Sequence, residues 1–123
     1  MSRDDAVILD LLEACGSALD FLGTMTRDQF TIDKKTRSAV LHQLLILGEA
    51  TKRLSIEFRD SHAEIPWREL AGMRDRVIHA YDRVDLDMVW FALKKRLPAL
   101  QGFLERQADQ SNDGDESRGN QRN

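Results

Sequence analysis

Cysteine, proline and glycine are all scarce in this chain of 123 residues, with one, two and seven copies respectively. The single cysteine, Cys15, cannot form a disulfide within the chain, and its place in an apolar stripe predicts a buried thiol. So few prolines and glycines disfavour sandwiches and barrels, which need many tight turns. No apolar run approaches the roughly 18 residues that span a bilayer, and the charged N-terminus lacks the apolar segment of a secretory signal. These absences predict a soluble, cytoplasmic protein.

A strong positive charge is also missing. The net charge is -3, and residues 1–107 carry 16 basic and 17 acidic side chains. A general nucleic-acid binder would be markedly basic, so any RNA contact must come from local clusters. The candidate clusters are Lys34, Lys35 and Arg37; Lys52 and Arg53; Arg74, Arg76 and Arg83; and Lys94, Lys95 and Arg96. For most of them we favour solvated helix faces with partners on the same helix.

Signatures of bound cofactors and metals are absent as well. No glycine-rich loop follows a strand, which excludes the common phosphate-binding loops. One cysteine and three scattered histidines give no zinc-ligand spacing. Asp85 and Asp87 are close together, but carboxylates at a helix start more often cap the helix than hold a metal. We therefore expect neither a cofactor nor a metal.

One histidine and two tryptophans are predicted to be structural, and a second histidine is predicted to be exposed. His42 lies among leucines and favours a structural histidine, whereas His62 lies in a polar stretch and is expected to be exposed. Trp67 and Trp90 occur at helical spacing among apolar residues, which is more typical of a core than of a base-stacking platform.

The sequence does show the pattern of amphipathic helices. Apolar residues recur at spacings of three and four in four segments: about 4–24, from 26 or 33 to 58, 66–80 and 86–107. Gly23 should end the first segment, Thr26 and Gln29 have capping-box spacing, and Pro98 should kink the last segment or remove a hydrogen bond there. We predict an all-α, antiparallel bundle of four to five helices over residues 1–107, followed by a disordered polar tail over 108–123.

The stretch from Leu70 to Tyr81 concentrates the residues capable of chemistry. At about 100° per residue, His79 lies about 140° round the helix from Arg74, so an unbroken helix would separate the two side chains. Either the helix ends near His79, or a second chain completes the site. RNA cleavage by the 2′-hydroxyl needs a base, an acid and cations for the phosphate, and a twofold dimer would supply two copies of each side chain.

This stretch resembles the Arg-x4-His-x-Tyr motif of HepT-like proteins, a branch of the HEPN ribonuclease superfamily. Arg74, His79 and Tyr81 fall on the three named positions, and Asp75 is the polar residue that HEPN motifs favour after the arginine. Similar segments extend over roughly residues 4–105: Leu47-Gly48-Glu49-Ala50, Arg53-Leu54-Ser55, Ile65-Pro66-Trp67, Ala71-Gly72-Met73, Val84-Asp85 and Val89-Trp90.

The resemblance implies a HEPN-like helical toxin of a toxin–antitoxin pair, which acts as a homodimer, or a larger complex with its antitoxin, and cuts RNA (tRNA or mRNA) without a metal. Arg74 would bind the scissile phosphate, His79 would move protons, and Asp75 would orient one of the two. The antitoxin would be a minimal nucleotidyltransferase that uses ATP to attach AMP to Tyr81. Such an adduct would occupy the phosphate site beside Arg74 and repel RNA. Glu49 would support the cleft, or form only a salt bridge or a helix contact.

Two other interpretations stay open at this level. The chain could be a non-catalytic helical module that keeps the motif as a docking surface for the nucleotidyltransferase. Tyr81 could also be a packing residue alone.

Overall fold

The computed structural model of the chain describes the backbone of residues 2–82 and 85–121 and the side chains of residues 2–79 and 85–111. Every regular element in this described part is helical, as the sequence predicted for an all-α fold. The elements are α1 (Arg3–Leu22), α2 (Arg27–Ile32), α3 (Lys34–Thr51), α4 (Ile56–Ser61), α5 (Trp67–Ala71), α6 (Met73–Asp82), α7 (Leu86–Phe91), a π-helical turn η1 (Ala92–Arg96) and α8 (Leu97–Gln121).

The boundaries of the first two helices follow the predicted signals. Gly23 ends α1 with φ 56°, a conformation that glycine adopts without steric cost. The Thr26 hydroxyl accepts the N–H of Gln29, and the Gln29 side chain accepts the N–H of Thr26, which completes the predicted capping box.

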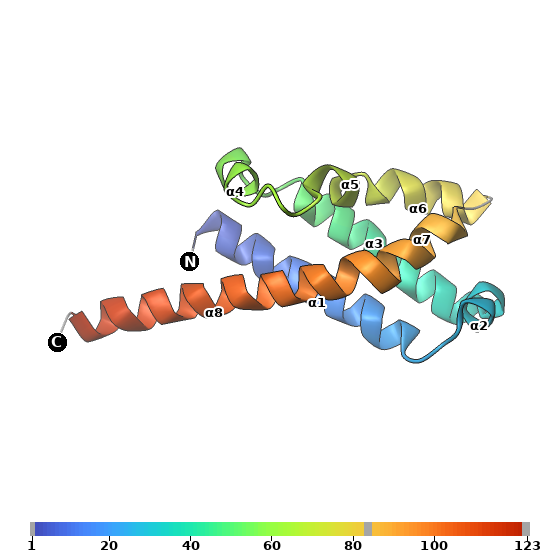
Figure 1. Cartoon of the computed structure of the whole chain (residues 1–123), viewed down its shortest axis with the longest axis horizontal. Coiled ribbons are helices and arrows are strands. Elements are labelled where there is room, and N and C mark those ends of the chain that lie inside the picture. The colour runs from blue at the N-terminus through green and yellow to red at the C-terminus, as the bar shows by residue number, and fades with distance from the viewer. Residues whose placement is uncertain (1, 83–84, 122–123) are drawn as a thin grey trace.

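The helices form a bundle in which α3 is central. It packs against α1 along most of its length and against α5 and α6 on its other side, while α8 packs on α1 (Figure 1). Buried apolar side chains join these helices into one core, among them Leu11, Leu41, Leu44, Leu47, Leu70, Val77, Leu93, Leu97 and Leu104. All of these positions lie in the four segments where the sequence shows apolar residues at helical spacing.

The predicted second helix ends earlier than expected, at Thr51 rather than near Phe58. The reason is a contact between distant parts of the chain. Ser55 caps α4 by accepting the N–H of Phe58, and it donates both its own N–H and its hydroxyl to the Asp4 carboxylate, at 2.8 and 2.6 Å. This arrangement starts a new helix at Ile56, so the segment from 59 to 61 is helical as well and not a loop.

The last two predicted helices are also subdivided. The segment from 66 to 80 breaks at Gly72 into α5 and α6. Before Pro98 the chain makes a π-helical turn, in which the N–H of Leu97 donates to the carbonyl of Ala92. A proline ring clashes with the carbonyl four residues before it, and the wider turn relieves that clash in place of a simple kink.

The two structural expectations for histidines are both wrong. His42 lies on α3 but is exposed, because it faces away from the leucines that surround it in the sequence. His62 is half-buried, with its ring centroid 4.6 Å from that of Phe58 and 5.0 Å from that of Phe103. The polar neighbours of His62 in the sequence led to the wrong prediction, because Phe103 of α8 covers the His62 ring.

Trp67, Trp90 and Cys15 follow the prediction. Trp67 is buried and donates its indole N–H to the carbonyl of His62, and the half-buried Trp90 packs on Phe30. Cys15 is fully buried, and burial raises the pKa of its thiol to about 12, with a smaller contribution from Glu105. This thiol is therefore a packing group.

The backbone of α8 continues through residues 108–121, the region predicted to be a disordered tail (Figure 1). The side chains from residue 112 onward lie outside the described residues, so the domain boundary at 107 and the disorder of the tail stay predictions. Among the helices described, none is both long and apolar enough to cross a membrane.

Candidate active site

The motif helix α6 runs without a break from Met73 to Asp82. The helix ends at Asp82, so His79 lies in its last turn, and the backbone stays helical from Arg74 through His79. Both side chains are exposed, and they point about 140° apart around the same helix. Within one chain the two motif residues cannot face the same phosphate.

Arg74 is positioned by α3. Its Nε lies 3.2 Å from Oε1 of Glu49, and the same Glu49 oxygen lies 3.5 Å from Nζ of Lys52. The Glu49 carboxylate thus contacts the Nε side of the guanidinium, which leaves the two terminal nitrogens for another anion. Glu49 forms the salt bridge that the sequence left open as one of its roles.

The close packing of α3 against the start of α6 depends on Gly48. A Cβ at this position would lie 3.0 Å from the backbone nitrogen of Arg74, 3.3 Å from the carbonyl oxygen of Leu70 and 3.3 Å from Cβ of Met73. Glycine allows the backbones to approach at the point where Glu49 and Arg74 meet. Gly48 therefore permits the close packing of α3 on α6, and Glu49 forms the ion pair with Arg74.

Asp75 and His79 occupy the outward side of α6. They are four residues apart, so they share a face opposite the buried Met73 and Val77. Asp75 makes no ion pair or hydrogen bond with the described residues. The predicted orienting role of Asp75 is compatible with a contact to His79, because the two residues share a face of α6. This role stays a prediction.

Arg76 lies on the other flank of α6 and was noted in the sequence only as part of a basic cluster. The residue is half-buried, with Nη1 3.7 Å from Sδ of Met88 on α7. Because Arg76 is three residues from His79, the two side chains are only about 60° apart. The three-residue spacing of Arg76 and His79 is the sequence signal that could have identified Arg76 as a candidate site residue.

Tyr81 belongs to α6 by its backbone. Its side chain lies outside the described residues, so its predicted modification stays a prediction.

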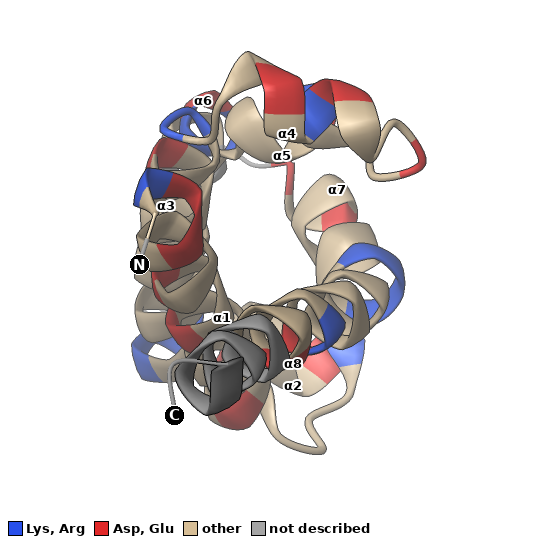
Figure 2. Cartoon of the chain, turned by 90° about the vertical axis from the view of Figure 1, so that its left-hand side faces the viewer, with Lys and Arg blue, Asp and Glu red and all other residues tan. Residues whose placement is uncertain are grey.

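The other basic clusters are partly neutralised, mostly by partners on other helices. Arg53 pairs with Asp10 at 3.1 Å and Arg96 with Glu69 at 3.1 Å, whereas Lys52, the C-cap residue of α3, pairs with Glu49 of that helix. Lys94 lies over the ring of Trp90 at 5.5 Å. Among the charged residues coloured in Figure 2, Lys and Arg alternate with Asp and Glu around the bundle. The described Lys and Arg residues therefore do not form a single broad basic surface.

The two carboxylates at the start of α7 are accounted for by the fold. Asp85 occupies the predicted N-cap position but makes no capping hydrogen bond with its side chain, and Asp87 pairs with Arg27 on α2. In the part of the chain that the structure describes, no three His, Cys, Asp or Glu side chains gather as metal ligands would.

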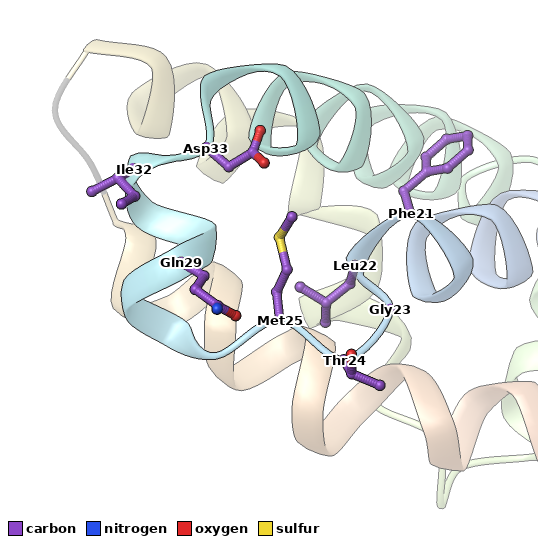
Figure 3. Close-up of a pocket in the computed structure, with 8 residues that line it drawn as sticks. All are labelled: Phe21, Leu22, Gly23, Thr24, Met25, Gln29, Ile32 and Asp33. Atoms are coloured by element: carbon purple, nitrogen blue, oxygen red, sulfur yellow. The ribbon is translucent and has the colours of Figure 1, made fainter.

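An open pocket of about 690 Å³ lies where α1 turns into α2 (Figure 3). Its lining includes Phe21, Met25 and Ile32, and it contains no Lys, Arg or His. The one carboxylate in the lining, Asp33, caps α3 by accepting the N–H of Thr36. This pocket therefore lacks the groups that RNA chemistry needs, and the exposed face of α6 is the better candidate.

Comparison with known proteins shows the family of the chain. The family described as "Ribonuclease HepT-like" matches residues 11–107, which include the whole of α6. The chain is 43% identical over 101 residues to "Probable ribonuclease HepT" of Thermococcus cleftensis, covering 79% of this chain and 92% of that protein. It is 36% identical over 93 residues to a candidate RNase of Methanocaldococcus jannaschii, covering 76% of this chain and 77% of the other.

A candidate RNase of Caldanaerobacter subterraneus subsp. tengcongensis is 35% identical over 91 residues, covering 74% of this chain and 81% of that protein. No solved structure matches the chain significantly. The family match covers most of the bundle and the relatives match along most of their own length, so the chain belongs to the HepT-like family of the HEPN ribonuclease superfamily.

Proposed function

We propose that this protein is a metal-independent endoribonuclease, the toxin of a toxin–antitoxin pair, with an active site built by two copies of the chain. The observation that carries the proposal is the placement of Arg74 and His79. Both are exposed on one unbroken helix of a ribonuclease family member, yet they point about 140° apart.

In the proposed reaction, the 2′-hydroxyl of RNA attacks the adjacent phosphorus. A base takes the hydroxyl proton, the bond from phosphorus to the 5′-oxygen breaks, and an acid returns a proton to that oxygen. The products are a 2′,3′-cyclic phosphate and a 5′-hydroxyl. His79 moves these protons, and Arg74 stabilises the negative charge that develops on the phosphate oxygens.

A twofold dimer would resolve the separation of the two side chains. If two α6 helices face each other across a cleft, Arg74 of one copy can approach the phosphate that His79 of the other copy acts on. Glu49 would hold the Nε side of Arg74 while the terminal nitrogens bind the phosphate in a bidentate manner. Asp75 would orient His79 from the same face of α6.

Tyr81 is the proposed point of control. A nucleotidyltransferase partner would transfer AMP from ATP to the tyrosine hydroxyl, with pyrophosphate as the leaving group. The added phosphate would occupy the site beside Arg74 that is meant for an RNA phosphate, and its negative charge would repel the RNA backbone.

The first experiment measures cleavage of RNA in EDTA by the purified chain. We expect cleavage with cyclic phosphate ends, and a loss of at least about a hundredfold in Arg74→Ala and in His79→Ala, since each removes a group used in the transition state. His42→Ala is the matched control for His79, because it also removes an exposed histidine from a helix. Addition of AMP to Tyr81 by the partner enzyme should stop cleavage.

Unchanged cleavage in both Arg74→Ala and His79→Ala would remove the assigned roles. If the wild-type chain cuts no RNA and does not inhibit growth when expressed, the non-catalytic interaction module is the better description. If incubation with the nucleotidyltransferase and ATP leaves the mass unchanged, Tyr81 is not the point of control.

A further inference from the structure

A second cation lies closer to His79 than the motif arginine does. Within one chain, Arg76 is about 60° from His79 around α6, whereas Arg74 is about 140° away and is directed toward α3. Arg76 is not one of the residues to which the family motif assigns a role. Its position beside the proposed proton-transfer residue calls for a separate explanation.

The contacts of Arg76 hold the guanidinium in place without neutralising it. Nη1 lies 3.7 Å from the sulfur of Met88, and no described carboxylate pairs with Arg76, in contrast to Arg27, Arg53, Arg74 and Arg96. A thioether is at most a weak acceptor. The positive charge is therefore available to an anion that approaches α6 from the side of α7.

Exposed apolar side chains continue this surface onto α7. Met88 is 39% exposed and Phe91 is 45% exposed, and three-residue spacing puts both on one side of α7. The guanidinium carbon of Arg96 lies over the Phe91 ring, 5.2 Å from its centroid. We call the surface formed by Arg76, His79, Met88 and Phe91 the α6–α7 face; α6 and α7 meet there at one end of the bundle (Figure 1).

Cations next to an exposed aromatic ring are the combination that binds single-stranded nucleic acid. Lysine and arginine take the phosphates, and the ring stacks on an unpaired base. We propose that the α6–α7 face is a binding subsite for single-stranded RNA, in which Arg76 binds a phosphate next to the scissile one and Phe91 stacks on a base. This inference rests on the proposed ribonuclease function and adds its substrate class: RNA whose bases are unpaired beside the cut.

Charge favours RNA over a second copy of the chain as the occupant. Asp87, the carboxylate next to Met88 in the sequence, is already paired with Arg27. An RNA phosphate would supply the negative charge that Arg76 lacks among the described residues, and in the proposed dimer this face borders the cleft between the two α6 helices.

The test measures RNA binding without cleavage. A short fluorescein-labelled single-stranded RNA is titrated with the His79→Ala chain, and affinity is read by fluorescence anisotropy at several salt concentrations. Adding Arg76→Ala should weaken binding about fivefold and lower the salt dependence by about one released ion. Adding Phe91→Ala should weaken binding about tenfold with little change in salt dependence, and duplex RNA should bind less tightly than the single strand.

Matched controls separate the subsite from general effects. Arg59→Ala removes another half-buried arginine that has no described carboxylate partner, and Phe21→Ala removes a phenylalanine that is 47% exposed, close to the 45% of Phe91. Both should bind RNA like the His79→Ala parent.

Parental affinity in both the Arg76 and Phe91 variants would overturn the inference. Sedimentation of the same variants tests the competing occupant, since dissociation into smaller particles would show that the face joins two copies and would also overturn it. These results are independent of the cleavage test. Loss of cleavage in Arg74→Ala and His79→Ala, together with parental RNA binding in the two variants, would leave the proposed function intact and reject only the subsite.

Discussion

Arg74 is held by a residue from another helix rather than by its neighbour in the motif. The family resemblance implied that Asp75 orients Arg74 or His79, and the structure places Glu49 of α3 at 3.2 Å from Nε of Arg74. Asp75 lies on the outward face with His79 instead. The two carboxylates therefore have different candidate partners, one for each motif residue, and this division can be tested at the scale of single residues.

Replacing Glu49 by alanine should lower the rate of RNA cleavage about three- to tenfold, because an exposed ion pair contributes little by itself but fixes the orientation of the guanidinium. If Glu49 acts through Arg74, the same replacement made in the Arg74→Ala background should have almost no further effect on the residual rate. Single-turnover cleavage by the four chains of this double-mutant cycle measures the coupling.

Lys52→Ala is the control for this cycle, because it removes the other cation next to Glu49 and leaves Arg74 in place. Its rate should stay close to that of the wild type. Equal losses from Glu49→Ala in the presence and absence of Arg74 would mean that Glu49 acts independently of the arginine.

At the scale of helices, the position of α6 is set where it begins. Gly72 separates α5 from α6, and Gly48 lets the start of α6 lie directly on α3. The helix then continues without a break, so its first turn determines the directions in which Arg74, Arg76 and His79 point. A change at Gly48 is therefore expected to affect both packing and the site.

Gly48→Ala should destabilise the protein by about 1–2 kcal/mol, because overpacking of the α3–α6 contact outweighs the gain of about 1 kcal/mol in helix propensity. Chemical denaturation gives the free energy of unfolding, and RNA cleavage should fall as Arg74 moves. Gly16→Ala provides the matched comparison, because its Cβ would have only an ordinary contact, 3.6 Å from the Gln101 side chain. That variant should be neutral or slightly stabilised, and the same result for Gly48→Ala would contradict the close-approach argument.

At the scale of the whole molecule, one chain forms a complete core but not a complete site. Buried side chains from α1, α3, α5, α6, the π-helical turn and α8 make one cluster within a single chain. The exposed face of α6 nevertheless separates the two motif residues. The proposed dimer therefore concerns chemistry rather than folding, and it predicts complementation between two inactive chains.

A randomly assorted mixture of Arg74→Ala and His79→Ala chains should recover about a quarter of wild-type activity, and the mixed dimers within it about half. With random assortment, half of the dimers are mixed, and in each of these one of the two sites keeps an intact arginine and histidine. Co-expression with two affinity tags yields the mixture, and each variant alone is the control. Activity no higher than that of the single variants would show that Arg74 and His79 do not act in trans.

The sequence by itself determined the helices, the apolar stripes and the family. Gly23, Thr26 and the stripes on α1 and α3 act through local backbone geometry and periodicity, which neighbours in the sequence reveal. The motif residues were also visible, because they match the spacing of the HepT-like motif, and the helix predicted to carry them is present as α6.

Only the tertiary structure decided which residues meet across helices. Asp4 starts α4 by binding Ser55, Phe103 covers His62, and Glu49 rather than Asp75 holds Arg74. Each of these contacts joins residues at least 25 positions apart, as their numbering shows. Helical period predicts the face on which a side chain lies, but not which helix will cover that face, because that depends on packing of the whole bundle.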